Sequence, residues 1–210
     1  EETDEDLVMI FAPGSSLGGA RPKASVYDQH GNLSIAKFPK ETDEYSVERW
    51  EAIALDMAEK AGIRVADHDL VTVAGRTVFL SQRFDRMRVE GGGEDHRIPF
   101  MSAMAMTEHS DGDNDCSYLE LVEAINTRGA DPDNDRAELF RRIAFTILTS
   151  NTDDHFRNHG FLWVGKNGWI LSPAYDINPA STSLGVLSTR VDFNESTASI
   201  ELLRSVAEFF

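Results

Sequence analysis

Hydrophobic and polar residues alternate with a period of two along much of the first half of the chain. Alternating runs at 24–28 and 33–38 flank the turn sequence HGN, which predicts a β-hairpin. Two further runs, 69–73 and 77–83, are joined by a tight turn at 74–76 and predict a second pair of strands. This half of the chain is therefore expected to be rich in β-structure.

One long helix is predicted within this β-rich half. From Val47 to Ala61, apolar residues recur at the three- and four-residue spacing of a helix face. Ser46 stands where a helix cap is expected, and Gly62 is a natural stop. The apolar run at 7–12 also predicts a short strand near the start of the chain.

The second half follows a different pattern, in which helical spacing dominates. Helices are predicted over 118–128, over 136–150 and from Ala198 onward, and the stretch 160–176 predicts another hairpin. The GGGED sequence at 91–95 predicts the boundary between the halves.

These patterns predict an α+β fold with two lobes. The β-rich N-lobe would span residues 1–90 and the mainly helical C-lobe residues 91–210. Clefts between such lobes are common ligand sites. Because the chain begins without Met and stops within a helical pattern, we expect a fragment with a shortened C-lobe.

Composition narrows the class of protein. The 210 residues are 41% hydrophobic and 27% charged, which is typical of soluble globular proteins. A formal net charge of -16 argues against a general nucleic-acid-binding face, although it leaves room for a local phosphate site. The single cysteine allows no internal disulfide and favours a cytoplasmic location, and we see no membrane-spanning run and expect no membrane partner.

The most unusual stretch is NTDDHFRNHGFLW at 151–163. Asp153 and Asn158 have the spacing of the protein-kinase catalytic loop, in which the aspartate is the base and the asparagine a metal ligand. A carboxylate can accept a hydroxyl proton, and an amide oxygen can bind magnesium without adding charge. The alternative is a polar turn capped by Asn151 and Asp154, and this stretch alone leaves both interpretations open.

Other features occur in the order that a kinase requires. A glycine-rich segment at 14–23 precedes Lys37 on a strand, Glu51 on the next helix, and Asp176 after a short strand. Kinases use such a lysine on the phosphates, the glutamate to hold it, and the aspartate to bind magnesium. Each feature has a plain alternative, namely a hairpin loop, solvated charges or a turn. The occurrence of all these features in this order is much less expected by chance than the occurrence of any one of them.

Several stretches together resemble the HipA-type toxin kinases. They are SLGGARPK (16–23), IAKFP (35–39), SQRFDR (81–86), NTDDHFRNHGF (151–161) and SPAYDI (172–177). The resemblance spans residues 10–210 and implies a divergent protein-kinase-like fold. It also implies ATP- and Mg²⁺-dependent phosphorylation of serine or threonine within a bacterial toxin–antitoxin module.

The resemblance assigns roles to individual residues. Asp153 would be the catalytic base, and Asn158 and Asp176 would bind magnesium. His155 and Lys37 would lie at the phosphates. The sequence DIN at 176–178, in place of the usual DFG, departs from ordinary kinases.

Further nucleotide contacts and a modification site follow from the same resemblance. The implied contacts are Gly18, Gly19, Ala20 and Lys23 over the phosphates, Glu51 beside Lys37, Gln82 and Phe84 at adenine, and Asp85 at ribose. Ser16 would be autophosphorylated, with Ser15 as a neighbour. A phosphate there would add about two negative charges and expel the loop from ATP.

The expected partners are ATP, a protein substrate and an antitoxin protein, which binds DNA in this family. Family substrates include aminoacyl-tRNA synthetases, and no direct nucleic-acid binding is expected from the chain itself. Two alternatives stay open: a kinase acting on a small molecule, and a weakly catalytic nucleotide-binding module that sequesters a partner. The joint presence of Asp153, Asn158 and Asp176 counts against the second alternative.

Four other residues complete the expectations. Trp50 and Trp163 occupy helical and strand positions and are expected in the core. His109 and His159 are expected at the surface. A zinc site is not expected, since the cysteine and histidines lack the spacing of zinc ligands.

Overall fold

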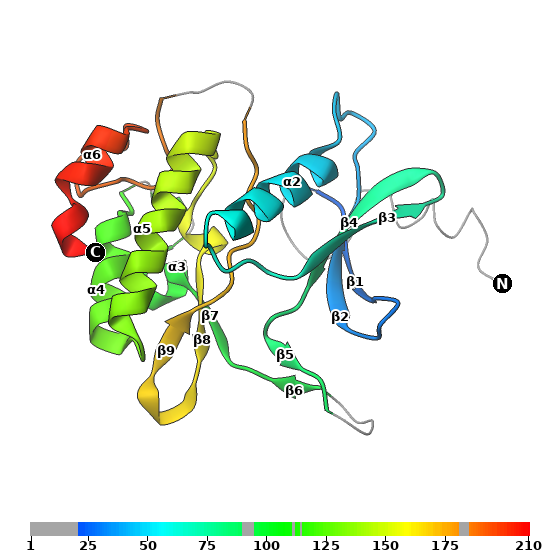
Figure 1. Ribbon diagram of the computed structural model, residues 1–210, viewed down its shortest axis with the longest axis horizontal. Helices are drawn as coiled ribbons and strands as arrows, with labels where there is room; N and C mark the ends of the chain where they lie inside the picture. Colours follow the sequence, from blue (N-terminus) through cyan, green and yellow to red (C-terminus); the bar gives the residue numbers. More distant parts are fainter. Residues whose placement is uncertain (1–20, 90–94, 111, 114, 181–184) are drawn as a thin grey trace. The chain divides into compact units, whose positions relative to one another are not determined.

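The computed structural model combines helices and sheets, which confirms the predicted mixed fold (Figure 1). The structure describes residues 21–89, 95–110, 112–113, 115–180 and 185–210. The strand predicted at 7–12 and most of the glycine-rich segment lie outside these residues.

The described residues form two compact units. The first contains the residues up to Ile53 together with Ala66–His96, and the second contains Ala54–Val65 and Arg97–Phe210. The predicted lobe boundaries at residue 90 stay a prediction. No helix in the described part of the chain is both long and apolar enough to cross a membrane.

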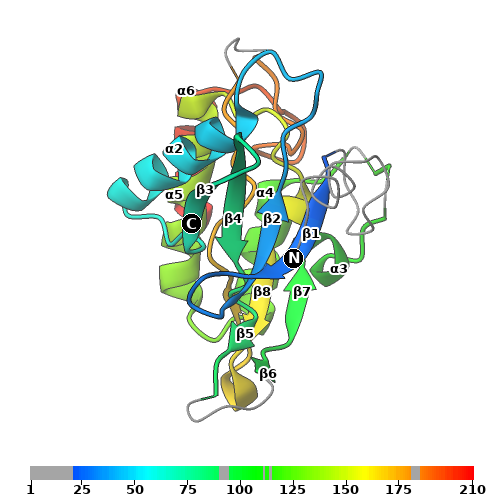
Figure 2. The same ribbon diagram turned by 90° about the vertical axis from the view of Figure 1, so that its right-hand side faces the viewer.

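The first unit is built on a four-stranded antiparallel sheet. Its strands are β1 (Lys23–Tyr27), β2 (Leu33–Lys37), β3 (His68–Val73) and β4 (Arg76–Gln82), in the order β1-β2-β4-β3 (Figure 2). Both predicted hairpins are confirmed. Between β3 and β4, Ala74 and Gly75 have φ angles of 48° and 74°, as a two-residue type I′ turn requires. The short strands β5 (Arg86–Met87) and β6 (His96–Arg97) form a separate ribbon.

Helix α2 (Val47–Lys60) confirms the predicted helix, and Gly62 follows it with a φ angle of 80°. The expectation that Trp50 lies in the core is wrong, because its exposed fraction is 50%. Apolar residues surround more of this helix than one face can bury. The buried face includes Leu55 and Ala58, and it leaves Trp50 and Met57 to solvent.

The second unit combines helices with a small sheet. Its elements are β7 (Phe100–Ser102), α3 (Ala103–Met106), α4 (Tyr118–Arg128), α5 (Pro132–Thr149), η1 (Phe156–Asn158), β8 (Gly160–Trp163), η2 (Gly165–Asn167), β9 (Trp169–Leu171), α6 (Ile200–Ser205) and η3 (Ala207–Phe209). The predicted hairpin forms β8 and β9, and β7 adds a third antiparallel strand beside β8. The expectation that Trp163 lies in the core is wrong, since it is 39% exposed and packs edge-on against Trp169.

The starts of α4 and α5 are set by residues that favour helix N-termini. Helix α4 begins with a reciprocal capping box between Ser117 and Glu120. Helix α5 begins at Pro132, one turn before the predicted start. Its first turn is polar and so escapes a search for apolar spacing, but proline at the first helical position is a recognised start.

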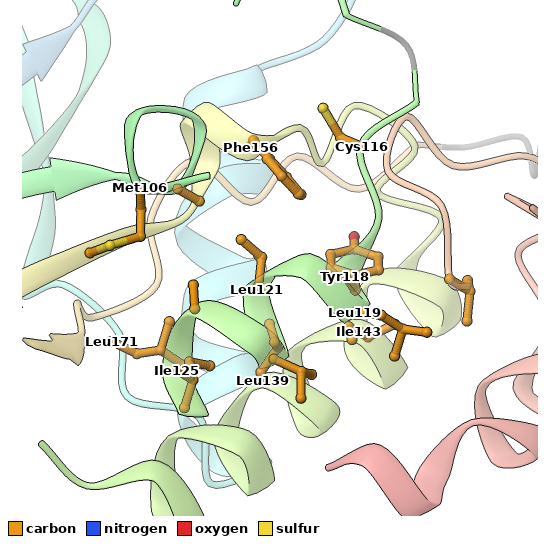
Figure 3. Close-up of a cluster of buried hydrophobic side chains, with 14 of the residues drawn as sticks. Met106, Cys116, Tyr118, Leu119, Leu121, Ile125, Leu139, Ile143, Phe156 and Leu171 are labelled. Atoms are coloured by element: carbon orange, nitrogen blue, oxygen red, sulfur yellow. The ribbon is translucent and has the colours of Figure 1, made fainter. Parts of the chain in front are cut away.

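The core of the second unit lies where α4 and α5 pack together (Figure 3). Its fully buried side chains include Tyr118, Leu121, Ile125, Leu139, Ile143, Phe156 and Leu171. Phe156 belongs to the NTDDHFRN stretch, so the candidate catalytic loop is anchored directly in the core. Met106, the last residue of α3, is also buried there.

The turn between β8 and β9 offers a test of its geometry. Gly168 has a φ angle of 107°, and a Cβ atom there would lie 2.5 Å from the backbone oxygen of Arg128. Gly165 has a φ angle of 80° but open space around it. We expect Gly168→Ala to lower the free energy of unfolding by about 2–3 kcal/mol, and Gly165→Ala by about 1 kcal/mol. Equal losses in urea denaturation would contradict this account.

Candidate active site

In the first unit, the structure brings the predicted lysine and glutamate together. The Lys37 ammonium lies 2.5 Å from Oε1 of Glu51, and the two residues are only 7% and 2% exposed. Lys37 also lies over the ring of the buried Phe79, 5.6 Å from its centre. A buried charge pair of this kind fixes the position of the ammonium group.

Lys23 lies on the same face of the sheet as Lys37. The two lysines are directly opposite each other in the β1–β2 register, and opposed residues of neighbouring strands project to the same side. Like charges placed in this way repel each other unless an anion compensates them. Glu51 supplies one such anion, and this face of the sheet could hold another. Gly18, Gly19, Ala20 and Ser16 lie outside the described residues.

The residues expected at adenine and ribose follow β4. The amide of Gln82 donates to the backbone oxygen of Asp67, and Phe84 follows in the turn. The Asp85 carboxylate accepts hydrogen bonds from Arg83 at 2.8 and 2.5 Å and from Arg86 at 2.6 Å. Burial opposes its ionisation, but the two guanidinium groups hold the pKa of Asp85 below its usual value. Contact with a ribose would have to compete with both arginines, and that role stays a prediction.

Arg21 is a candidate that sequence reasoning missed. Its guanidinium group donates to Asp43 at 2.9 and 2.5 Å and to Glu48 at 2.5 Å. Because Glu48 stands in the first turn of α2, this ion pair fixes the end of the glycine-rich segment against the helix. An arginine beside a loop and a glutamate on a helix are indistinguishable in sequence from solvated charges.

In the second unit, two hydrogen bonds within the candidate catalytic loop converge on Asp153. The backbone oxygen of Asp153 accepts from the side-chain Nδ2 of Asn158 at 3.1 Å and from the amide of His155 at 3.0 Å. The Asp153 side chain is exposed, whereas Asn158 is 8% exposed. No described residue hydrogen-bonds Oδ1 of Asn158, so this oxygen can accept a ligand. The Nδ1 atom of His155 is buried without a partner among the described residues.

The segment that carries Asp176 lies beside this loop. The Tyr175 hydroxyl donates to the backbone oxygen of Arg157 at 2.8 Å, and the amide of Asn178 donates to Oδ1 of Asn151 at 3.3 Å. Asp176 itself has a φ angle of 58°, in the left-handed region that is uncommon outside glycine. Such conformations occur preferentially at functional sites.

The oxygen atoms of Asn158 and Asp176 fit the chemistry of magnesium. Mg²⁺ prefers oxygen ligands and is commonly held by one or two protein groups, with water and substrate phosphates completing its shell. The described residues contain no cluster of three or more His, Cys, Asp or Glu side chains suited to a metal ion. A magnesium ion shared with nucleotide phosphates requires no such cluster.

One alternative and one expectation about the second unit are wrong. Asp154 does not cap α5, whose C-cap residue is Ser150, but is a buried residue, 5% exposed. His159 is buried at 3% rather than exposed. Both contribute to a cavity of about 20 Å³, which has room for one water molecule. The lining residues with polar side-chain atoms are Arg142, Thr146, Asn151, Asp154, Asn158, His159 and Tyr175.

His109 is also less exposed than expected. Its side chain is 15% exposed, and its ring nitrogens lie 2.9 Å from Glu120 and 3.3 Å from Asp113. The edge of the ring packs against Phe156, with 5.6 Å between ring centres. The hydrogen bond with Glu120 raises the pKa of His109 despite partial burial.

The raised pKa predicts how stability depends on pH. A group whose pKa is higher in the folded state adds stability that is complete below its unfolded pKa and lost as pH rises through the folded pKa. His109→Gln should therefore cost about 1 kcal/mol at about pH 6, and the cost should shrink at alkaline pH. Urea denaturation across this range, with the exposed His96→Gln as control, measures the difference. A cost that is independent of pH would contradict the ion pair.

Comparison with known proteins is consistent with this geometry. The family model of the HipA-like C-terminal domain matches residues 15–208. A putative kinase of Haemophilus influenzae is 26% identical over 182 residues, covering 78% of this chain and 52% of that protein. The putative kinase Y4mE of Sinorhizobium fredii is 26% identical over 182 residues, covering 77% and 41%. The chain thus spans about half, or less, of the length of these relatives.

Solved structures show the same fold. HipA of Shewanella oneidensis, in a complex with HipB and operator DNA, matches with a TM-score of 0.77 at 18% identity, covering 92% of this chain and 53% of that one. The proinflammatory kinase CtkA of Helicobacter pylori matches with a TM-score of 0.63 at 15% identity, covering 83% and 69%. Because the family model matches nearly the whole of this chain, the chain belongs to the HipA-like C-terminal domain family.

Proposed function

We propose that this chain is the catalytic region of an ATP- and magnesium-dependent serine/threonine protein kinase. The observation that carries the proposal is the buried contact of 2.5 Å between Lys37 and Glu51. Protein kinases use such a pair to hold a strand lysine against nucleotide phosphates. The names of the two curated relatives, both putative kinases, support the same activity.

Each candidate residue has a definite task in this reaction. Asp153, whose side chain is exposed, would accept the proton of the substrate hydroxyl as its oxygen attacks the γ-phosphorus. The bond from that phosphorus to the β–γ bridging oxygen would break, and ADP would leave. Lys37 and His155 would bind the phosphates, and Asn158 and Asp176 would hold magnesium. The metal would neutralise charge on the transferred phosphoryl group.

The biological setting is part of the proposal. A structural neighbour of this chain is a toxin–antitoxin protein, HipA, crystallised with HipB and operator DNA. We propose that the complete protein likewise acts in a toxin–antitoxin module in the cytoplasm, with a DNA-binding antitoxin as partner. Its target would be a protein, with an aminoacyl-tRNA synthetase as one candidate, and Ser16 would be its site of autophosphorylation.

The first test is transfer of labelled phosphate. Incubation with γ-labelled ATP and Mg²⁺ should label the chain, and removal of Mg²⁺ should abolish labelling. Ser16→Ala should remove the label, whereas the matched control Ser15→Ala should keep it. ATP binding by calorimetry without any transfer would favour a nucleotide-binding module. Transfer only to a small hydroxyl compound would favour a small-molecule kinase.

A further inference from the structure

Two neighbouring acids in the candidate catalytic loop have opposite environments. The side chain of Asp153 is exposed, but that of Asp154 is only 7% exposed. Within the described part of the chain, Oδ2 of Asp154 accepts three hydrogen bonds. The donors are the Tyr118 hydroxyl at 2.5 Å, Nε2 of His159 at 3.0 Å and the Thr146 hydroxyl at 3.3 Å.

The three donors come from separate elements of the second unit. Tyr118 is the first residue of α4, Thr146 lies in the last turns of α5, and His159 immediately precedes β8. All three are buried, with exposed fractions of 0%, 5% and 3%. Figure 3 shows the Tyr118 ring among the labelled apolar side chains, with its hydroxyl directed away from Leu119 and Ile143. The carboxylate of Asp154 therefore ties the loop to two helices and to the residue that precedes β8.

The backbone on both sides of Asp153 is held as well. The Thr189 hydroxyl donates to the backbone oxygen of Asp154 at 2.7 Å. The amide and hydroxyl of Ser188 donate to the backbone oxygen of Thr152 at 3.0 and 2.7 Å. Both neighbours of Asp153 are thus fixed, while its own side chain remains exposed to solvent.

A carboxylate suits this position better than a neutral residue would. An ionised carboxylate only accepts hydrogen bonds, and three donors converge on it here. Burial acts to raise the pKa of Asp154, but the adjacent His159 ring and the hydrogen bonds hold it below the usual value. Asparagine could keep one acceptor oxygen at this place but would lose the charge.

We propose that Asp154 is a positioning residue, whose buried carboxylate holds the loop at 151–158 so that Asp153 and Asn158 keep the geometry needed for phosphoryl transfer. This inference rests on the proposed kinase function. It differs from a purely structural role because it predicts a loss in kcat that is larger than any loss of nucleotide binding.

The test compares Asp154→Ala, Asp154→Asn and Tyr118→Phe with Leu139→Ala. Leu139 is fully buried in the core between α4 and α5, so its truncation lowers stability without removing a bond to the loop. Asp154→Ala should lower kcat about 100-fold, because displacement of a reacting group by about 1 Å has this effect. The Asn and Phe variants should lose less, and in each variant the loss in kcat should exceed any rise in the KM for ATP, because Lys37, a proposed phosphate contact, lies outside this loop.

Hydrogen exchange supplies a readout that does not depend on activity. The amides of His155 and Asn158 bond within the loop, to the backbone oxygens of Asp153 and His155. Asp154→Ala and Asp154→Asn should speed exchange at both amides under native conditions, whereas Leu139→Ala should not do so selectively.

The possible outcomes separate the two proposals. A kcat near that of wild type in Asp154→Ala, or unchanged exchange in the loop, overturns the positioning role. If Asp154→Ala does not fold, Asp154→Asn and Tyr118→Phe decide by the same two readouts. If the wild-type chain transfers no phosphate, the kinase function fails, and exchange alone decides whether Asp154 holds the loop.

Discussion

Lys37→Met is expected to lower the free energy of unfolding by about 3–5 kcal/mol, because it removes the ammonium group that pairs with the buried Glu51 carboxylate. The contact is short, at 2.5 Å, and Glu51 is only 2% exposed. Methionine retains an apolar side chain of similar length, but the cation–π contact of the ammonium group with Phe79 is lost as well. The loss therefore reports mainly the broken charge pair, with a smaller contribution from the lost cation–π contact. Urea denaturation followed by circular dichroism measures it.

A double-mutant cycle separates this effect from packing. Lys37→Met combined with Glu51→Leu removes both charges, and it should cost less than the sum of the single changes. Lys60→Met is a matched control, because Lys60 is exposed at the end of α2 and its loss should stay within about 0.5 kcal/mol. If the double variant costs as much as the sum, the pair is not coupled in solution.

The same variants test the role of the pair in nucleotide binding. A folded Lys37→Met chain should bind ATP more weakly and transfer phosphate more slowly, since the proposed phosphate contact is gone. Glu51→Gln keeps the lysine but no longer fixes it by charge. It should therefore retain ATP binding better than Lys37→Met does. Equal binding by wild type and Lys37→Met would place the phosphates elsewhere.

Much of the fold could be predicted because its patterns are local. The strand runs in β1–β4 and the helix at Tyr118–Arg128 repeat with the period of their elements. Strand β7 could not be found in this way, since it has three residues and exists through its pairing with β8. The exposure of Trp50 could not be predicted either, because periodicity does not show which of several apolar faces another element covers.

The candidate site likewise contains residues that the sequence pattern identifies and residues that only the tertiary structure identifies. Lys37, Glu51, Asp153 and Asn158 stand out through spacing and order along the sequence. Asp154 looks like an ordinary loop acid there, because its three donors lie as far as 36 residues away in the chain. Arg21 was missed for the same reason, since its acidic partners lie 22 and 27 residues away in the chain. Burial and convergence of donors are properties of tertiary packing, and they carry no fixed spacing along the chain.

Asp153→Asn should lower the rate of phosphoryl transfer by about 10²–10⁴-fold, the usual contribution of a general base. Asparagine has nearly the same shape as aspartate but cannot take up the hydroxyl proton. Because Asn158 and His155 bond the backbone oxygen of Asp153 and not its side chain, the loop should keep its structure. The exposed side chain predicts that stability changes by no more than about 0.5 kcal/mol.

A loss of rate without a loss of stability would distinguish Asp153 from Asp154, whose buried carboxylate holds the loop. Single-turnover transfer with saturating ATP and Mg²⁺ measures the chemical step, and calorimetry should show unchanged ATP binding. Asp133→Asn is the control, since its side chain is 92% exposed at the start of α5 and its activity should match wild type. Transfer by Asp153→Asn at the wild-type rate would mean that another group accepts the proton. A loss of rate that follows a loss of folding would instead assign Asp153 a structural role.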